Sequence, residues 1–161
     1  VSKFDYIQAR IFSFFNREIG SHNFQSDKAI DSITSGGFFG KGIGEGTLKN
    51  RVPEAHTDYI ISVISEEFGV VAIILILLLF LIFIYMVFKK ISFENNDKIK
   101  LILIGSISLI LMQTTIHVGV NIRLFPTTGM TLPFLSYGGS SIVSTSILAG
   151  IILNLTKRKI S

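Results

Sequence analysis

The stretch PEAHTDYI, residues 53–60, divides the chain into two unlike parts. A polar, glycine-rich segment precedes it, and a long apolar segment follows it. The stretch itself carries carboxylate, imidazole and hydroxyl groups at the point where the chain becomes lipid-like. Such groups are costly to desolvate at a membrane boundary, which indicates a specific role for them. Either Thr57 or Asp58 caps the helix that follows, or Asp58 is a catalytic carboxylate that faces a membrane-bound substrate.

Three apolar segments follow this boundary, and each is long enough to cross a membrane. Residues 70–88 contain no charged side chain. Residues 101–120 and 140–156 are the other two segments. A membrane span needs about 20 mostly apolar residues, because the hydrocarbon core is about 30 Å thick. We therefore predict an all-α, polytopic membrane protein with three transmembrane helices.

The overall composition agrees with a membrane protein. The chain has 161 residues, of which 48% are hydrophobic, and a formal net charge of +4. It contains no cysteine, which excludes a disulfide framework and thiolate metal ligands. Its basic residues lie mostly beside the apolar segments instead of clustering on one face, so no nucleic-acid partner is expected. The chain begins with Val1 and shows no signal-peptide pattern, and we interpret it as a fragment or the product of a split gene.

The positions of the basic residues predict how the chain is oriented. Positive charge beside membrane spans marks the cytoplasmic side. The residues concerned are Lys89, Lys90, Lys98, Lys100, Lys157, Arg158 and Lys159. We therefore expect residues 89–100 to be a cytoplasmic loop and 157–161 a cytoplasmic tail. Residues 1–69 and the loop 121–139 then lie on the extracytoplasmic face, together with Asp58.

The segment before the first span contains several predicted helices. Residues 1–20 show apolar side chains at helical spacing, and this amphipathic helix either lies on the membrane surface or packs on its own protein. Residues 26–35 are a short helical candidate. From Asp58 to Gly69 the pattern indicates a helix that enters the membrane, with Glu66 and Glu67 marking the outer interface.

Glycines alternate around Lys41, at Gly40, Gly42, Gly44 and Gly46. Their spacing matches neither a P-loop nor a dinucleotide-binding fingerprint. From the spacing alone we expect a flexible loop.

The last two spans are joined by the loop 121–139, whose prolines and glycines forbid a continuous helix. Its apolar residues predict a re-entrant loop, which is stable only where it is buried in protein or lines water. The span before it ends with polar residues, Gln113 to His117, which are expected to face other helices or a wet cavity. We interpret His117 as an interior hydrogen-bonding residue and not as a metal ligand. Arg123 either contacts phosphate or faces solvent.

PEAHTDYI, the upstream SGGFFGKGIGEG and the downstream PTTGMTLPFLSYGGSS occur here in one order. Together they resemble the SEDS family, which comprises FtsW, RodA and SpoVE, and the variants PEAH and GEGTLK favour the FtsW type. The resemblance implies a ten-helix fold. This chain would be its C-terminal part, with the last three transmembrane helices and a large extracytoplasmic loop before them.

The resemblance also implies an activity. SEDS proteins polymerise lipid II into glycan strands on the outer face of the bacterial plasma membrane, here during cell division, together with a class B penicillin-binding protein and the division complex. A sugar hydroxyl needs a base, and the lipid diphosphate that leaves needs positive charge. A divalent cation, Mg²⁺ or Mn²⁺, is compatible with that diphosphate, but the sequence shows no ligand cluster for one.

The family motif assigns roles to individual residues. Asp58 matches the essential Asp and is expected to be the general base, with His56 as the alternative base. Glu54, His56 and Thr57 are expected to orient the motif or contact substrate. Lys41 is the first candidate for a diphosphate contact, and Ser136 is expected to line the cavity. The other cationic candidates are Lys49 and Arg51.

Two other functions are open. The first is a lipid II flippase, which would need polar groups along a path through the bilayer. Residues 70–88 carry no polar side chain except Tyr85, so the distribution favours chemistry on one side of the membrane. The second is a non-catalytic remnant of a split gene.

Overall fold

The computed structural model describes residues 21–47 and 55–157. Within these residues all regular structure is helical, as the sequence predicts. The helices are α2 (Ser21–Gly36), α4 (Ile60–Phe68), α5 (Val70–Phe93), α6 (Asp97–Asn121) and α7 (Gly139–Thr156). The amphipathic helix expected in residues 1–20 lies outside the described residues, as do Lys49, Arg51 and Glu54.

Three helices, α5, α6 and α7, are long and apolar enough to cross a membrane. These helices contain the three predicted spans. Helices α5 and α6 are longer than the predicted apolar segments, since a helix can continue into the polar residues beside the lipid. The connection between them shortens to residues 94–96. Asn96 ends this turn as the N-cap of α6, since its side chain accepts a hydrogen bond from the Lys98 backbone N–H at 3.0 Å.

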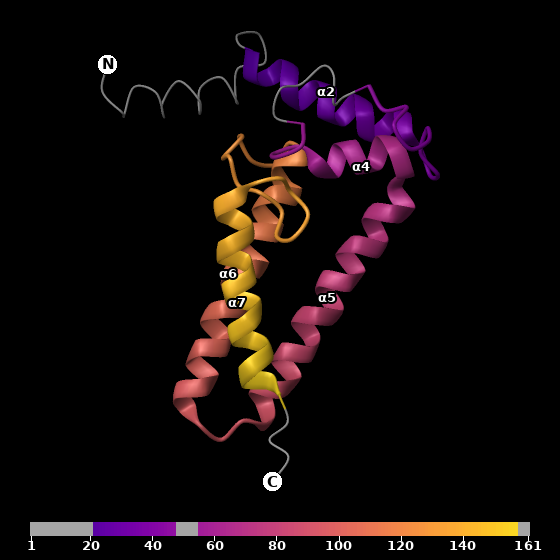
Figure 1. Ribbon diagram of the computed structural model, residues 1–161. Coiled ribbons are helices and arrows are strands. Elements are labelled where there is room, and N and C mark those ends of the chain that lie inside the picture. Colours follow the sequence, from indigo (N-terminus) through magenta and orange to yellow (C-terminus); the bar gives the residue numbers. More distant parts are fainter. Residues whose placement is uncertain (1–20, 48–54, 158–161) are drawn as a thin grey trace, which may run out of the picture.

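The three spans run side by side, while α2 and α4 lie across one end of them (Figure 1). At the opposite end, buried side chains of α5, α6 and α7 form one apolar cluster. Its members are Val87, Ile91, Leu103, Ile107, Ile110 and Ile152. Away from this cluster α5 diverges from α6 and α7, so the spans are farther apart toward α4 (Figure 1).

A second apolar cluster lies at the end of the spans near α4, where it joins α2, α4 and α6. It consists of Ala29 of α2, Ala55 and Tyr59 of the PEAHTDYI stretch, Val63 of α4 and Val120 of α6. This cluster fixes the PEAHTDYI stretch against the end of α6.

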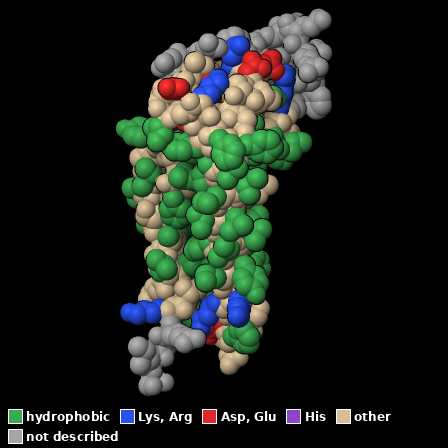
Figure 2. Space-filling model, turned by 90° about the vertical axis from the view of Figure 1, so that its right-hand side faces the viewer, with side chains coloured by type: hydrophobic (Ala, Val, Ile, Leu, Met, Phe, Trp, Pro, Cys, Tyr) green, Lys and Arg blue, Asp and Glu red, His purple; other side chains and the backbone are tan. Residues whose placement is uncertain are grey.

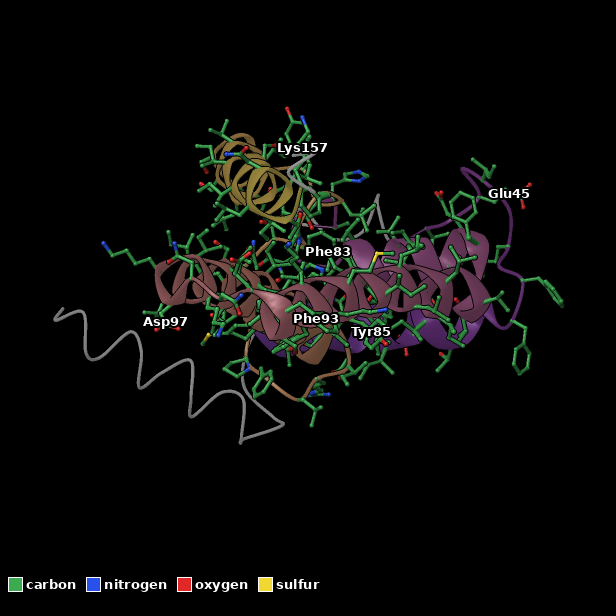
Figure 3. All side chains as sticks on the ribbon, turned by 90° about the horizontal axis from the view of Figure 1, so that it is seen from below. Glu45, Phe83, Tyr85, Phe93, Asp97 and Lys157 are labelled. Atoms are coloured by element: carbon green, nitrogen blue, oxygen red, sulfur yellow. The ribbon has the colours of Figure 1, made fainter. Side chains whose placement is uncertain are left out.

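The surface of the spans is apolar. Large hydrophobic side chains of α5, such as Ile74, Leu78 and Leu81, are exposed, and hydrophobic side chains form a broad band over this face (Figure 2). Charged side chains gather above and below the band (Figure 2). Figure 3, which looks along the spans, shows Phe83 on the side of α5 toward α7 and the exposed Tyr85 on the other side. This distribution agrees with a chain that spans a membrane.

Candidate functional site

Residues 55–59 form a turn that leads into α4. Asp58 is buried, with 6% of its surface exposed, and Tyr59 is fully buried beside it, whereas His56 is exposed. The N-cap of α4 is Tyr59, whose side chain makes no capping hydrogen bond. The prediction that Thr57 or Asp58 would be the N-cap is therefore wrong.

Asn121, at the end of α6, takes over the capping of α4. Its Oδ1 accepts hydrogen bonds from the Ser62 backbone N–H at 3.2 Å and the Ser62 hydroxyl at 2.8 Å. Its Nδ2 donates to the carbonyl oxygens of Asp58 and His117, both at 2.9 Å. The side chain is fully buried, and all four of its hydrogen-bonding positions are satisfied. A side chain 59 positions away in the sequence thus replaces the local cap.

Three successive carbonyl groups of the motif are held in this way, each by a different donor. The His56 carbonyl accepts from the Tyr137 backbone N–H at 3.1 Å. The Thr57 carbonyl accepts from the Ser136 hydroxyl at 2.8 Å, and the Asp58 carbonyl from Asn121. The backbone immediately before and at Asp58 is therefore fixed by the loop 121–139 and by α6.

Ser136 is buried and also accepts a hydrogen bond from the Leu132 backbone N–H at 2.8 Å. It thus joins the loop 121–139 to the motif, rather than only lining a cavity. The Nδ1 of His117 donates to the Met130 carbonyl at 2.8 Å, and the Nε2 of Gln113 donates to the Thr131 carbonyl at 2.8 Å. The polar end of α6 therefore holds this loop, and His117 is the interior hydrogen-bonding residue that the sequence predicts.

An apolar pocket of about 310 Å³ lies where the loop meets α5. Phe134 and Leu135 form one side of it, and Ile76, Leu79, Phe80 and Phe83 of α5 form the other. The pocket lies on the side where α5 diverges from α7.

Lys41 lies elsewhere, at the far end of α4. Its Nζ is 3.0 Å from the Oε1 of Glu66, which also accepts a hydrogen bond from the Thr47 hydroxyl at 3.1 Å. Glu66 is only 1% exposed, so its carboxylate is buried within the protein. A buried carboxylate is stabilised by such pairing. Helix α4 rises about 9 Å between Ile60 and Glu66, at 1.5 Å per residue, so Glu66 lies at the opposite end of α4 from the turn that carries Asp58.

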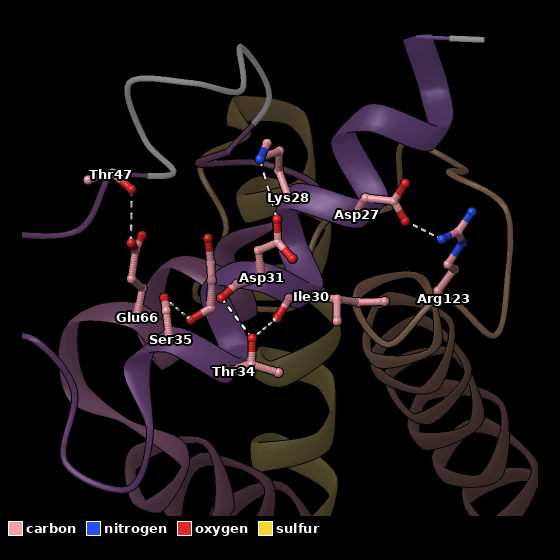
Figure 4. Close-up of polar contacts among 10 residues, drawn as sticks. Asp27, Lys28, Ile30, Asp31, Thr34, Ser35, Thr47, Glu66 and Arg123 are labelled. Atoms are coloured by element: carbon pink, nitrogen blue, oxygen red, sulfur yellow. Dashed lines mark hydrogen bonds and ion pairs between the residues drawn. The ribbon is translucent and has the colours of Figure 1, made fainter. Parts of the chain in front are cut away.

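A polar pocket of about 230 Å³ opens beside this ion pair, between α2 and α4. Figure 4 shows Thr47 and Glu66 near the side chains of α2 that reach this region. The residues that line the pocket are Lys28, Asp31, Ser32, Ser35, Lys41, Thr47 and Glu66.

The glycines of the loop after α2 allow close backbone packing on the end of α4. The backbone N–H groups of Lys41 and Gly42 donate to the carbonyls of Glu66 at 2.8 Å and Glu67 at 3.1 Å. Gly40 has a positive φ of 79°, and a Cβ there would lie 2.2 Å from the Glu67 carbonyl oxygen. Gly40 thus allows close contact between two backbones.

Arg123 does not simply face solvent. It pairs with Asp27 of α2 (Figure 4), and its side chain is only 17% exposed. This pair joins the start of the loop 121–139 to α2.

The structure therefore brings together Asp58, Thr57, His56 and Ser136, and it places Lys41 apart from them. Sequence reasoning missed Asn121 and the buried state of Glu66. The only signal for Asn121 was a polar residue at the end of an apolar span. Among the described residues no group of three or more His, Cys, Asp or Glu side chains could hold a metal ion.

Comparison with known proteins decides the family. The family model for FtsW, RodA and SpoVE, described as cell cycle protein, matches residues 1–160. The chain belongs to the FtsW/RodA/SpoVE family. Because the described structure also has three helices that could cross a membrane, this family member is a multi-pass membrane protein.

Curated FtsW relatives match almost the whole chain. A probable peptidoglycan glycosyltransferase FtsW from Enterococcus hirae is 38% identical over 162 residues, which cover 99% of this chain and 41% of that protein. The protein of the same name from Caulobacter vibrioides is 35% identical, with 97% of this chain and 40% of that protein covered. The chain thus spans about two fifths of the length of these FtsW relatives.

A solved structure has the same fold. It is described as "Structural coordination of polymerization and crosslinking by a peptidoglycan synthase complex" and matches with a TM-score of 0.71 at 26% identity. The match covers 94% of this chain and 41% of that chain. The arrangement of α2 to α7 is therefore an arrangement known from a peptidoglycan synthase.

Proposed function

We propose that the protein containing this chain is a peptidoglycan glycosyltransferase of the FtsW type, which polymerises lipid II during cell division with Asp58 as its general base. The observation that supports this most directly is the fixation of Asp58. The carbonyls of three successive residues, ending at Asp58, accept hydrogen bonds from Tyr137, Ser136 and Asn121. A base works best when its position is fixed in advance.

The proposed reaction is a glycosyl transfer. The hydroxyl oxygen of the acceptor sugar forms a bond to the anomeric carbon of the donor, and the bond from that carbon to the lipid diphosphate breaks. Asp58 takes the hydroxyl proton, and the diphosphate departs with the electron pair of the broken bond.

Cationic side chains are needed to balance the charge of the diphosphate, and the candidates differ in whether a carboxylate already neutralises them. Lys41 already neutralises Glu66, so its net attraction for an anion is reduced. Lys49 and Arg51, which adjoin the motif in sequence, then become the first candidates, although both lie outside the described residues. Glu54 is outside them too, and its proposed supporting role rests on the motif alone.

The catalytic face is proposed to be extracytoplasmic. Lys89, Lys90, Lys98, Lys100 and Lys157 lie around the ends of α5, α6 and α7 that are opposite to α4. By the positive-inside rule that end is cytoplasmic, so Asp58 lies on the outer side of the bacterial plasma membrane. We also propose a class B penicillin-binding protein as the partner that crosslinks the strands, in line with a solved relative whose description joins polymerization and crosslinking.

The test is polymerisation of lipid II by the full-length protein in proteoliposomes. We expect Asp58→Asn to lower the rate by about 10²- to 10⁴-fold, the usual contribution of a general base. The matched control is Asp97→Asn, because the Asp97 side chain is 92% exposed at the other end of the spans.

Two results would reject the proposal. If Asp58→Asn polymerised lipid II at the wild-type rate, Asp58 would not be the base. If the wild-type protein moved lipid II between leaflets but formed no polymer, the flippase hypothesis would replace the glycosyltransferase hypothesis.

A further inference from the structure

Three apolar side chains of the loop after α2 are almost fully exposed. Phe38 is 75% exposed, Phe39 87% and Ile43 79%. Single exposed apolar residues are normal on proteins, but three within six residues form a patch on a loop that lies outside the membrane-spanning helices. A patch of this kind marks an interaction surface.

The loop lies directly against the first turn of α5. The Val70 backbone N–H donates to the Gly37 carbonyl at 3.0 Å, and the Val71 N–H to the Phe38 carbonyl at 3.4 Å. The phenylalanines therefore lie at the same height along the membrane normal as the start of the span.

That height coincides with the outer edge of the hydrocarbon. Residues 70–88 rise about 28 Å at 1.5 Å per residue, and Lys89 and Lys90 follow at the other end. The hydrocarbon core is about 30 Å thick. If the two lysines mark its inner boundary, Val70 and the adjoining loop lie at its outer boundary.

The loop holds its aromatic side chains outward by close backbone contacts. A Cβ at Gly69 would lie 2.1 Å from the Phe38 carbonyl oxygen. The Gly40 N–H donates to the Gly36 carbonyl at 2.8 Å, and the Lys41 N–H to the Glu66 carbonyl. Because the backbone is engaged on the inner side, the side chains of Phe38 and Phe39 are left on the outer side.

The exposed surface of α5 continues the patch. Phe68 is exposed just before the span and Val71 in its first turn, and hydrophobic side chains reach from the spans up to this level (Figure 2). The patch is thus continuous with the exposed apolar surface of the span α5, which favours lipid as its occupant.

We infer that the loop 37–43 is an interfacial anchor that inserts Phe38, Phe39 and Ile43 into the outer leaflet of the bilayer. Apolar and aromatic side chains are favoured at this level of a membrane. Since the same loop is bonded to the end of α4, the anchor fixes the height of α4 relative to the lipid surface. This inference does not depend on the chemical role of Asp58.

Depth-dependent fluorescence quenching tests the anchor. The 161 residues contain no Trp, so Phe39→Trp provides a reporter once any Trp elsewhere in the full-length protein is replaced by Phe. The protein is reconstituted in phosphatidylethanolamine–phosphatidylglycerol vesicles with and without acyl-brominated phosphatidylcholine. Glu45→Trp is the matched control, because Glu45 is an exposed polar residue after the same loop (Figure 3).

We expect brominated lipid to quench Phe39→Trp several-fold more strongly than Glu45→Trp, and aqueous iodide to show the opposite order. Phe38→Trp should behave like Phe39→Trp and replaces it if that variant does not fold. Strong iodide quenching of both loop reporters would place the loop in water. Protection from both quenchers would show that protein, and not lipid, covers the patch; either result overturns the inference.

Discussion

At the scale of single residues, Asn121 has the greatest influence on the proposed site. It is a fully buried amide that joins the end of α6 to the start of α4 and to the Asp58 carbonyl. Neither Thr57 nor Asp58 is the N-cap of α4. The N-cap position of α4 is Tyr59, one residue after Asp58.

Asn121→Ala should destabilise the protein and lower its activity. The change leaves the Ser62 N–H and the Asp58 carbonyl without their buried partner, and each unsatisfied group costs about 1–3 kcal/mol. Thermal unfolding in detergent and lipid II polymerisation measure the two effects. Asn95→Ala, at an exposed position, is the matched control.

Measuring kcat and KM of the Asn121→Ala variant distinguishes a role in positioning Asp58 from a role in folding alone. If Asn121 positions Asp58, the variant should lose kcat at a temperature where it remains folded, with a smaller change in KM. A variant that stays folded and keeps the wild-type kcat would contradict the positioning role.

At the scale of elements, the loop after α2 and helix α4 form one packed unit. Backbone hydrogen bonds join Lys41 and Gly42 to the end of α4, and the Lys41–Glu66 pair lies beside them. Glycine is required where the two backbones approach. The sequence predicted a flexible loop here because alternating glycines carry no information about what they contact.

Gly40→Ala should therefore be strongly destabilising. The new Cβ would lie 2.2 Å from the Glu67 carbonyl oxygen, at a φ of 79° that alanine rarely adopts. We expect a loss of about 1–3 kcal/mol or more, the usual range for such strain, measured by thermal unfolding.

Gly105→Ala provides the comparison. Nothing lies within 4 Å of a Cβ at Gly105, which is inside α6. Because alanine is the better helix former, this variant should be neutral or slightly more stable. Equal unfolding temperatures for the two variants would show that the loop does not pack as described.

At the scale of the whole molecule, the three spans meet tightly at only one end. The apolar cluster of Val87, Leu103, Ile110 and their neighbours joins α5, α6 and α7 there. Toward α4, helix α5 diverges from α6 and α7, and the apolar pocket beside Phe134 and Leu135 opens between α5 and the loop 121–139. This arrangement leaves an apolar pocket near the end of the spans that carries the proposed site.

Leu103→Ala should loosen the end of the spans that is opposite to α4. Leu103 is fully buried, whereas Leu101 is 71% exposed, so Leu101→Ala is the matched control. Truncating a buried Leu costs about 2–5 kcal/mol in soluble proteins, and we expect the lower end, because lipid is as apolar as the core. Unfolding of the two variants in mixed micelles measures the difference; equal stabilities would contradict the packing.

The sequence alone determined the membrane class, the three spans, their orientation as a prediction and the motif that carries Asp58. It could do so because length, apolar content and flanking charge are local properties of the chain, and because the motifs are long. Tertiary structure decided which groups hold Asp58, how Glu66 is buried with Lys41, and where Arg123 pairs. These depend on contacts between residues 25 to 96 positions apart, and no local pattern specifies which of two distant polar groups meet when the helices pack.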